Sequence, residues 1–327
     1  MRWAVSSSSH PPKRHLDGFK AHVAKGQAGS APSRHTVAGS PQLPPGTPSQ
    51  PLPEMFRRPV PLVAEPVDQA AGLRRLFSVR SLRFVPVVSN PFISHGGVLI
   101  ERLCSTLDDL GLSTLVVDAS ERGSAPKELA RFDLAEGIES LSPGISYLAA
   151  RGLPVRWVDD RGSTRGFLDA VADAAPQTQV VLVHAGALEL TRLFGRGDDG
   201  LSRPRPVVLC DETPEAMTQA YAALKIMIQR VDWLAHDLLL AAPPASDQAR
   251  TVAQRLGQVS DLFLGGVQHH WVAVDPAETA DIDPSRALTE LVHGLVSSAA
   301  RYSASDSQFA ALARTPALPP TPHDSMN

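Results

Sequence analysis

Residues 84–120 read FVPVVSNPFISHGGVLIERLCSTLDDLGLSTLVVDAS. Leucines at positions 99, 103, 107 and 110 recur every three or four residues, which is the spacing of one face of a helix. We therefore expect a helix at residues 98–110 between apolar strands at 82–88 and 115–117, the second running into Asp118. A helix between two apolar strands is typical of a parallel sheet buried on both faces, so this stretch predicts an α/β fold.

The chain beyond this stretch repeats the alternation of strands and helices. Thr213 followed by Pro214 marks the clearest helix start, because threonine caps a first turn and proline fits its first position. Residues 134–150 combine a helix-like segment with a strand or turn around Ile145. Further strands are expected at 155–158, 180–183, 207–209, 238–241, 263–267 and 271–274, and further helices at 164–175, 214–230, 245–256 and 284–300. The pattern predicts one domain at residues 81–300, built on a doubly wound, mostly parallel sheet.

The two ends of the chain differ in composition from this domain. Residues 1–58 and 301–327 are rich in Pro and Ser and show almost no periodic apolar pattern. Such segments cannot bury enough apolar surface to offset the entropy lost on ordering. We therefore expect disordered N- and C-terminal tails around a domain whose core draws on 43% hydrophobic residues.

Composition also excludes several classes of protein. The net charge of −3 provides no basic field, so a nucleic-acid partner is not expected. No apolar run reaches the roughly 20 residues that a membrane helix needs, and the N-terminus lacks the apolar region of a signal peptide. Cys104 and Cys210 both lie in apolar contexts, which predicts buried, reduced thiols. A cytoplasmic protein is the expectation.

Residues 59–80 lie between the N-terminal tail and the domain. The apolar residues of PVDQAAGLRRLF, at 66–77, follow helical spacing and predict one short amphipathic helix. This helix either packs on the edge of the domain or serves as a docking segment whose polar side chains contact a partner. The pattern alone leaves both interpretations open.

The loop after the first strand has the position of a phosphate-binding loop. A strand–loop–helix–strand unit with a glycine pair at the helix start is the frame in which P-loop proteins bind nucleotide. The motif of that loop is G-x-x-x-x-G-K-[ST], whereas residues 89–97 read SNPFISHGG, without a lysine. Amides at the start of a helix still attract anions, so His95, Gly96 and Gly97 remain candidates for anion binding.

Three stretches carry a resemblance to a known family. They are DQAAGLRRL at residues 68–76, TPEAMTQAYAALK at 213–225 and FLGGVQHHWVAVDPAE at 263–278. Together with the order of the elements, they resemble the MinD/ParA family of deviant Walker ATPases, and within it the FlhG group (also called FleN or YlxH). The resemblance spans residues 66–300 and implies a MinD-type, P-loop NTPase-like fold.

The resemblance also implies a function. Proteins of the FlhG group bind ATP, dimerise across the nucleotide, associate with membrane through a C-terminal amphipathic helix and control flagellar number. Their DQAxxLR segment stimulates FlhF, a GTPase of the signal-recognition type. The resemblance therefore implies partner contacts at Asp68, Gln69, Leu73 and Arg74, with an FlhF-like GTPase or another flagellar regulator. It also implies a homodimer, or a heterodimer with a MinD/FlhG homologue.

The charged groups of the family's nucleotide site are missing from this sequence. The Walker lysine falls on Gly96, the magnesium-binding hydroxyl on Gly97 and the signature lysine on Pro91. The remaining family positions, a second acidic residue, the Walker B aspartate and an adenine-reading asparagine, fall on Ser120, His184 and Ala241.

Of the family's charged positions only Asp118 persists. Because phosphoryl transfer depends on such charges, the resemblance predicts a degenerate phosphate loop at His95, Gly96, Gly97 and Asp118, with no catalytic residue. A pseudo-ATPase without a cofactor follows; ATP with Mg²⁺ would bind only if the degenerate loop retains affinity.

Other candidate features are weaker. His184 and the pair His269–His270 lack the spacing of metal ligands, so no metal site is expected. Residues 303–314 lack the apolar and basic faces of a membrane anchor, so a place at the cell pole or inner membrane would depend on partners. Two other functions stay open: a working MinD/ParA-type ATPase with an atypical loop, and a MinD-like accessory protein of another secretion or cellulose-export system.

Overall fold

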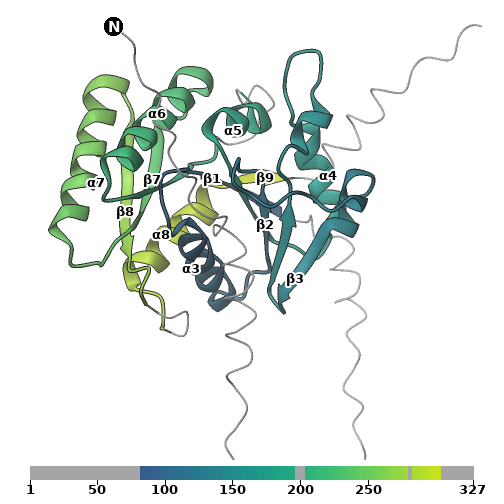
Figure 1. The fold of residues 1–327 in the computed structure, drawn as a ribbon, viewed down its shortest axis with the longest axis horizontal. Coiled ribbons are helices and arrows are strands. Elements are labelled where there is room, and N and C mark those ends of the chain that lie inside the picture. The colour runs from purple at the N-terminus through teal and green to yellow at the C-terminus, as the bar shows by residue number, and fades with distance from the viewer. Residues whose placement is uncertain (1–81, 196–202, 279–281, 303–327) are drawn as a thin grey trace, which may run out of the picture. The chain divides into compact units, whose positions relative to one another are not determined.

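The computed structural model describes residues 82–195, 203–278 and 282–302 (Figure 1). Residues 1–58 and 303–327 lie outside these ranges, whereas Arg301 and Tyr302, which the sequence assigned to a disordered tail, belong to a strand that pairs with residues 82–84. The segment at 59–80 also lies outside the described ranges, so the contacts expected of Asp68, Gln69, Leu73 and Arg74 stay predictions.

A nine-stranded sheet organises the described residues. Its order is β3-β4-β2-β5-β1-β6-β7-β8, and β9 pairs with β1. Strands β3 and β4 form an antiparallel hairpin, β9 runs antiparallel to β1, and the other neighbours are parallel. The strands are β1 (Leu82–Val88), β2 (Thr114–Asp118), β3 (Ile138–Ser142), β4 (Ile145–Ala149), β5 (Val180–Ala185), β6 (Val207–Asp211), β7 (Ala235–Ala241), β8 (Val267–Val274) and β9 (Ala300–Tyr302). The expected α/β fold with a doubly wound, mostly parallel sheet is confirmed.

Helices cover both faces of this sheet (Figure 1). Helices α3 (Gly96–Asp109) and α8 (Arg286–Ser298) pack together on one face. On the other face α4 (Gly166–Ala174), α5 (Ala187–Phe194), α6 (Pro214–Val231) and α7 (Asp247–Val259) follow one another side by side. Because both faces are covered, central strands such as β2 and β5 are buried along their whole length.

The start of α6 is the one that the sequence predicts. The hydroxyl of Thr213 accepts a hydrogen bond from Ala216 N at 3.3 Å, and Pro214 occupies the first helical position. Cys104 and Cys210 are also as expected, since both are buried and free. Burial raises the pKa of the Cys210 thiol to about 12, which keeps it protonated and unreactive.

Three expectations about local structure are wrong. Residues 155–157 of the strand expected at 155–158 belong to a 3₁₀ helix, Pro154–Trp157, whose proline has no N–H for a ladder. Residues 260–264 form a π-helix, Ser260–Leu264, so one strand, β8, replaces the two that were expected at 263–274. The helix-like part of the segment at 134–150 forms a single 3₁₀ turn followed by β3, whereas the strand or turn expected around Ile145 is β4.

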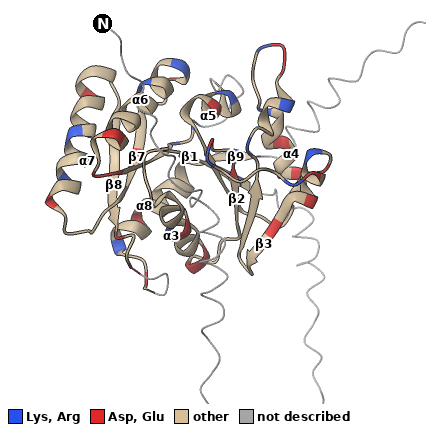
Figure 2. Cartoon of the chain, in the orientation of Figure 1, with Lys and Arg blue, Asp and Glu red and all other residues tan. Residues whose placement is uncertain are grey.

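None of the helices in the described ranges is long and apolar enough to span a membrane. Figure 2 shows Lys and Arg interspersed with Asp and Glu over these helices.

Candidate functional site

The carboxyl ends of β1, β2 and β5 meet at one edge of the sheet. Strand β1 lies between β5 and β6, so the strand order reverses there, and such a switch point is where open α/β sheets bind ligands. A cavity of about 50 Å³ lies at this edge. Pockets that enclose small-molecule ligands measure about 300–1,000 Å³, so this one has room for a few water molecules only. Its lining residues are Ser89, Asn90, Pro91, Ile93, Ser120, Glu121, Arg122, His184, Gly186 and Gln219.

Asn90 holds the loop after β1 in place. Its Nδ2 donates to the carbonyls of Leu209 at 3.1 Å and Ala216 at 2.9 Å, while its Oδ1 accepts from Phe92 N at 3.1 Å. The side chain is buried, and these three bonds connect the loop to β6 and to the first turn of α6. Asn90 therefore fixes the shape of the loop. Sequence reasoning missed this role, because the Asn-Pro pair indicates only a turn.

Asp118, at the end of β2, is fully buried and its carboxylate is engaged on both oxygens. Nδ1 of His184 donates to Oδ1 at 2.8 Å, and the backbone N–H of Ser120 donates to the same oxygen at 3.2 Å. The hydroxyl of Tyr147 donates to Oδ2 at 3.1 Å. Strand register brings His184 here, since β2 and β5 are neighbours and Asp118 pairs with His184.

These contacts set the ionisation of the cluster. Burial alone would raise the pKa of Asp118, but the hydrogen bond and charge of His184, with the bonds from Ser120, hold that pKa below its ordinary value. Burial, together with the charge and hydrogen bond of Asp118, raises the pKa of the Tyr147 phenol. A neutral phenol thus donates to an ionised carboxylate.

The backbone at Gly123 closes over this carboxylate. A Cβ at Gly123 would lie 2.4 Å from Asp118 Oδ2, a distance at which a side chain cannot fit. Only glycine permits such a close approach of main chain to the acid. The Asp118–His184–Tyr147 cluster is therefore sealed on the side of the loop at 120–123.

The residues predicted to form the anion site do not line this cavity. His95 is exposed just before α3, with no side-chain cap hydrogen bond, and Gly96 and Gly97 are buried in the first turn. Their amides have no intrahelical partner because they begin a helix. None of these three residues lines the cavity, and neither does Asp118. Whether they bind an anion stays a prediction.

Of the positions at which the family's functional groups are missing, some line the cavity and others do not. Pro91, Ser120 and His184 line the cavity, whereas Ala241 lies at the end of β7, where it pairs with Asp211 and Val274. No lysine is among the lining residues, and Arg122 is the permanent cation there.

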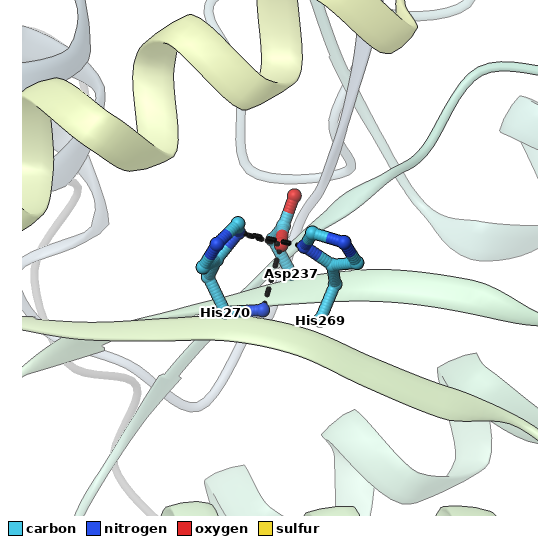
Figure 3. Close-up of side chains that lie close together, drawn as sticks. All are labelled: Asp237, His269 and His270. Carbon is cyan, nitrogen blue, oxygen red and sulfur yellow. Dashed lines mark hydrogen bonds and ion pairs between the residues drawn. The ribbon is translucent and has the colours of Figure 1, made fainter.

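A second cluster of titratable side chains lies at the opposite edge of the sheet. Asp237 in β7 lies beside His269 and His270 of β8, and their ligand atoms are all within 4.8 Å of one another (Figure 3). The spacing of the histidines did not predict this cluster.

No protein-family model and no curated protein matches the chain. Solved structures with a similar arrangement include MinD cell division protein of Aquifex aeolicus, at 11% identity and a TM-score of 0.44 over 66% of this chain and 97% of that chain. They also include a plasmid partition protein of Borrelia burgdorferi, at 7% identity and a TM-score of 0.45 over 66% of this chain and 97% of that one. A third is cobyrinic acid a,c-diamide synthase of Mycobacterium smegmatis, at 14% identity and a TM-score of 0.43 over 65% of this chain and 93% of that one. At these scores and identities the similarity assigns no ligand, activity or partner to this chain.

Proposed function

We propose that this protein is a FlhG-like regulator of flagellar biosynthesis that acts through protein–protein contacts and does not hydrolyse ATP. The observation that carries the proposal is that Asp118 is buried and hydrogen-bonded to protein groups. This carboxylate is the only charged group that persists at the family's positions, and it is fully buried and engaged by His184, Tyr147 and Ser120.

A phosphoryl-transfer site needs cations and Mg²⁺ around the β- and γ-phosphates. Here the loop contributes Pro91, Gly96 and Gly97 where the family has two lysines and a hydroxyl. The one acid that persists, Asp118, accepts three hydrogen bonds from protein groups. The strand–loop–helix–strand unit that would bind a nucleotide thus contributes to the core of the protein instead.

The first experiment titrates the full chain with ATP and Mg²⁺ by isothermal titration calorimetry. We expect no saturable heat at micromolar concentrations and no phosphate release. Weak anion binding at the start of α3 would respond equally to pyrophosphate and would not require Mg²⁺, because helix amides recognise charge only. Micromolar, Mg²⁺-dependent ATP binding would sink the proposal and favour the working ATPase with an atypical loop.

The second experiment tests the docking segment. A pull-down of an FlhF-like GTPase should succeed with the wild-type chain and lose most of its yield with Asp68→Ala/Arg74→Ala. The matched control, Asp17→Ala/Lys20→Ala, removes one acid and one base from the N-terminal tail and should bind as the wild type does. Equal binding by both double variants would remove the docking proposal.

The flagellar assignment is separable from the loss of hydrolysis. If the gene lies among genes of a secretion or cellulose-export system and the GTPase does not bind, an accessory role in that system replaces the flagellar one. The pseudo-ATPase proposal would stand in that case, since it depends on Asp118 and the loop.

A further inference from the structure

Asp237 is buried near the amino end of β7, at the edge of the sheet opposite to Asp118. Its backbone N–H donates to the carbonyl of Pro206, just before β6, which places it at the start of the strand. Its side chain is fully buried, yet the His270 side chain beside it is 42% exposed. A buried carboxylate therefore borders on an exposed pair of imidazoles (Figure 3).

A β-bulge brings the two histidines to the same carboxylate. In the pairing of β7 with β8, His236 lies opposite Gln268 and Leu238 lies opposite Trp271. Two residues, His269 and His270, thus oppose the single residue Asp237. In a regular strand adjacent side chains point to opposite faces, whereas a bulge re-aims one of them.

We propose that Asp237, His269 and His270 form a binding site for a divalent transition-metal ion, with Zn²⁺ as the expected ion. Each of the three residues offers one ligand atom, and these atoms all lie within 4.8 Å of one another. Nδ1 of His270 lies 3.4 Å from Asp237 Oδ1 and 2.8 Å from Nδ1 of His269. Two imidazoles and a carboxylate are a ligand set that suits Zn²⁺, and three protein ligands leave a fourth position for water or a partner's side chain.

Arg205 supplies the outer contact that such a site needs. Its Nε donates to Asp237 Oδ2 at 2.5 Å, while Oδ1 accepts from His270 N at 3.0 Å and lies 3.4 Å from His270 Nδ1. Oδ1 therefore faces the histidines, while Oδ2 is held by Arg205. Hydrogen bonds of this kind orient a carboxylate ligand and are typical of metal sites.

The imidazoles need only a small movement to accept an ion. Their Nδ1 atoms lie 2.8 Å apart. With Zn–N distances of about 2.0–2.1 Å and tetrahedral angles, two nitrogen ligands are about 3.3 Å apart. His269 is exposed and can rotate by the few tenths of an ångström required.

A purely structural Arg205–Asp237 ion pair is the competing explanation. That pair requires neither His269 nor the re-aimed His270, so the two explanations differ in what the histidines do. The test is therefore placed on the exposed histidines, whose replacement leaves the ion pair intact.

The experiment titrates the metal-free full chain with Zn²⁺ in competition with a chromophoric chelator. The wild type is compared with His269→Ala/His270→Ala, and with the control His95→Ala/His293→Ala, which removes two exposed histidines elsewhere. We expect the first variant to lose one equivalent of Zn²⁺, or to bind it at least tenfold more weakly, while the control binds as the wild type does. Thermal melts in EDTA verify that all three chains are equally folded.

Cobalt(II) provides a second measurement. The wild type should show the intense visible absorption of a tetrahedral Co²⁺ site, and His269→Ala/His270→Ala should not. Equal Zn²⁺ affinity and stoichiometry in the wild type and in His269→Ala/His270→Ala would overturn the proposal, and so would equal loss in the control variant.

Discussion

Two buried aspartates have opposite surroundings: Asp118 lies at the carboxyl end of β2, and Asp237 lies near the amino end of β7. Asp118 and Asp237 are both fully buried, and each contacts a histidine of a neighbouring strand. Around Asp118 the partners are themselves buried, and the backbone at Gly123 lies close against the carboxylate. Around Asp237 the partners reach solvent, since the His270 side chain is 42% exposed and that of Arg205 is 12% exposed.

The difference separates two uses of a buried carboxylate. A buried carboxylate that accepts hydrogen bonds on both oxygens stabilises the fold, and its oxygens are already occupied by protein groups. An open cluster has donor atoms that can exchange a protein contact for a ligand contact. The edge where this fold class usually binds a ligand is the sealed one, and the edge at the amino ends is the open one.

The largest effect should follow from removing the sealed carboxylate. Asp118→Ala leaves His184 and Tyr147 buried without their shared acceptor, and loss of one member of a buried pair costs about 3–5 kcal/mol of unfolding free energy. Asp237→Ala should cost less, about 1–3 kcal/mol, because its partners can turn to water. Urea unfolding of both variants measures the difference. Equal losses, or a stable Asp118→Ala, would contradict the distinction between sealed and open clusters.

A second prediction uses pH to identify the charge of Asp118. Its pKa is below the ordinary 3.8 in the folded state, so its contribution is fully present above about pH 4. The contribution is lost as pH falls through the lower, folded-state pKa. Asp118→Asn should therefore cost about 1.5–3 kcal/mol at pH 6, the value of hydrogen bonds to a charged group, and progressively less below pH 4.

Urea unfolding of both chains from pH 7 to pH 3 measures this difference. A gap that widens towards acid pH would mean that the Asp118 carboxyl is protonated in the folded protein, and would contradict the assignment.

Much of the α/β fold was predictable from local sequence patterns. The leucine spacing at 99–110 and the Thr213–Pro214 start each depend on a few adjacent residues, which is why the α/β alternation was recovered. The strand expected at 155–158 failed because a short apolar run also suits a 3₁₀ turn that packs inward, as Trp157 does against Phe167 with ring centroids 5.1 Å apart.

The clusters were not predictable, because each depends on strand order or register. Asp118 and His184 are 66 positions apart and meet only because β2 and β5 are neighbours in the sheet. His269 and His270 share a side only because a bulge interrupts β8, and a regular strand would have separated them. Sequence patterns report periodicity within an element, and these contacts arise between elements.

A third prediction places a methyl group inside the sealed cluster. Gly123→Ala would bring Cβ within 2.4 Å of Asp118 Oδ2, an atom held by Tyr147 and unable to retreat. We expect a loss of about 1–2 kcal/mol, in the lower part of the range for overpacking, measured by urea unfolding. Unchanged stability would show that the loop at 120–123 moves freely off the carboxylate, and the cluster would then not be sealed.

The smallest effect should come from a second glycine-to-alanine substitution, placed beside the Asp237 cluster. A Cβ at Gly294 in α8 would lie 2.6 Å from Arg205 Nη2, the far end of a flexible side chain that borders on solvent. Arg205 can shift, and alanine gains about 1 kcal/mol over glycine inside a helix, so Gly294→Ala should change the unfolding free energy by less than about 1 kcal/mol. A loss as large as that of Gly123→Ala would mean that Arg205 is locked in place, and the Asp237 cluster would then be as rigid as the Asp118 cluster. A near-zero change, measured by urea unfolding in EDTA, would instead show that the end of the Arg205 side chain shifts at little cost, as expected of an open cluster.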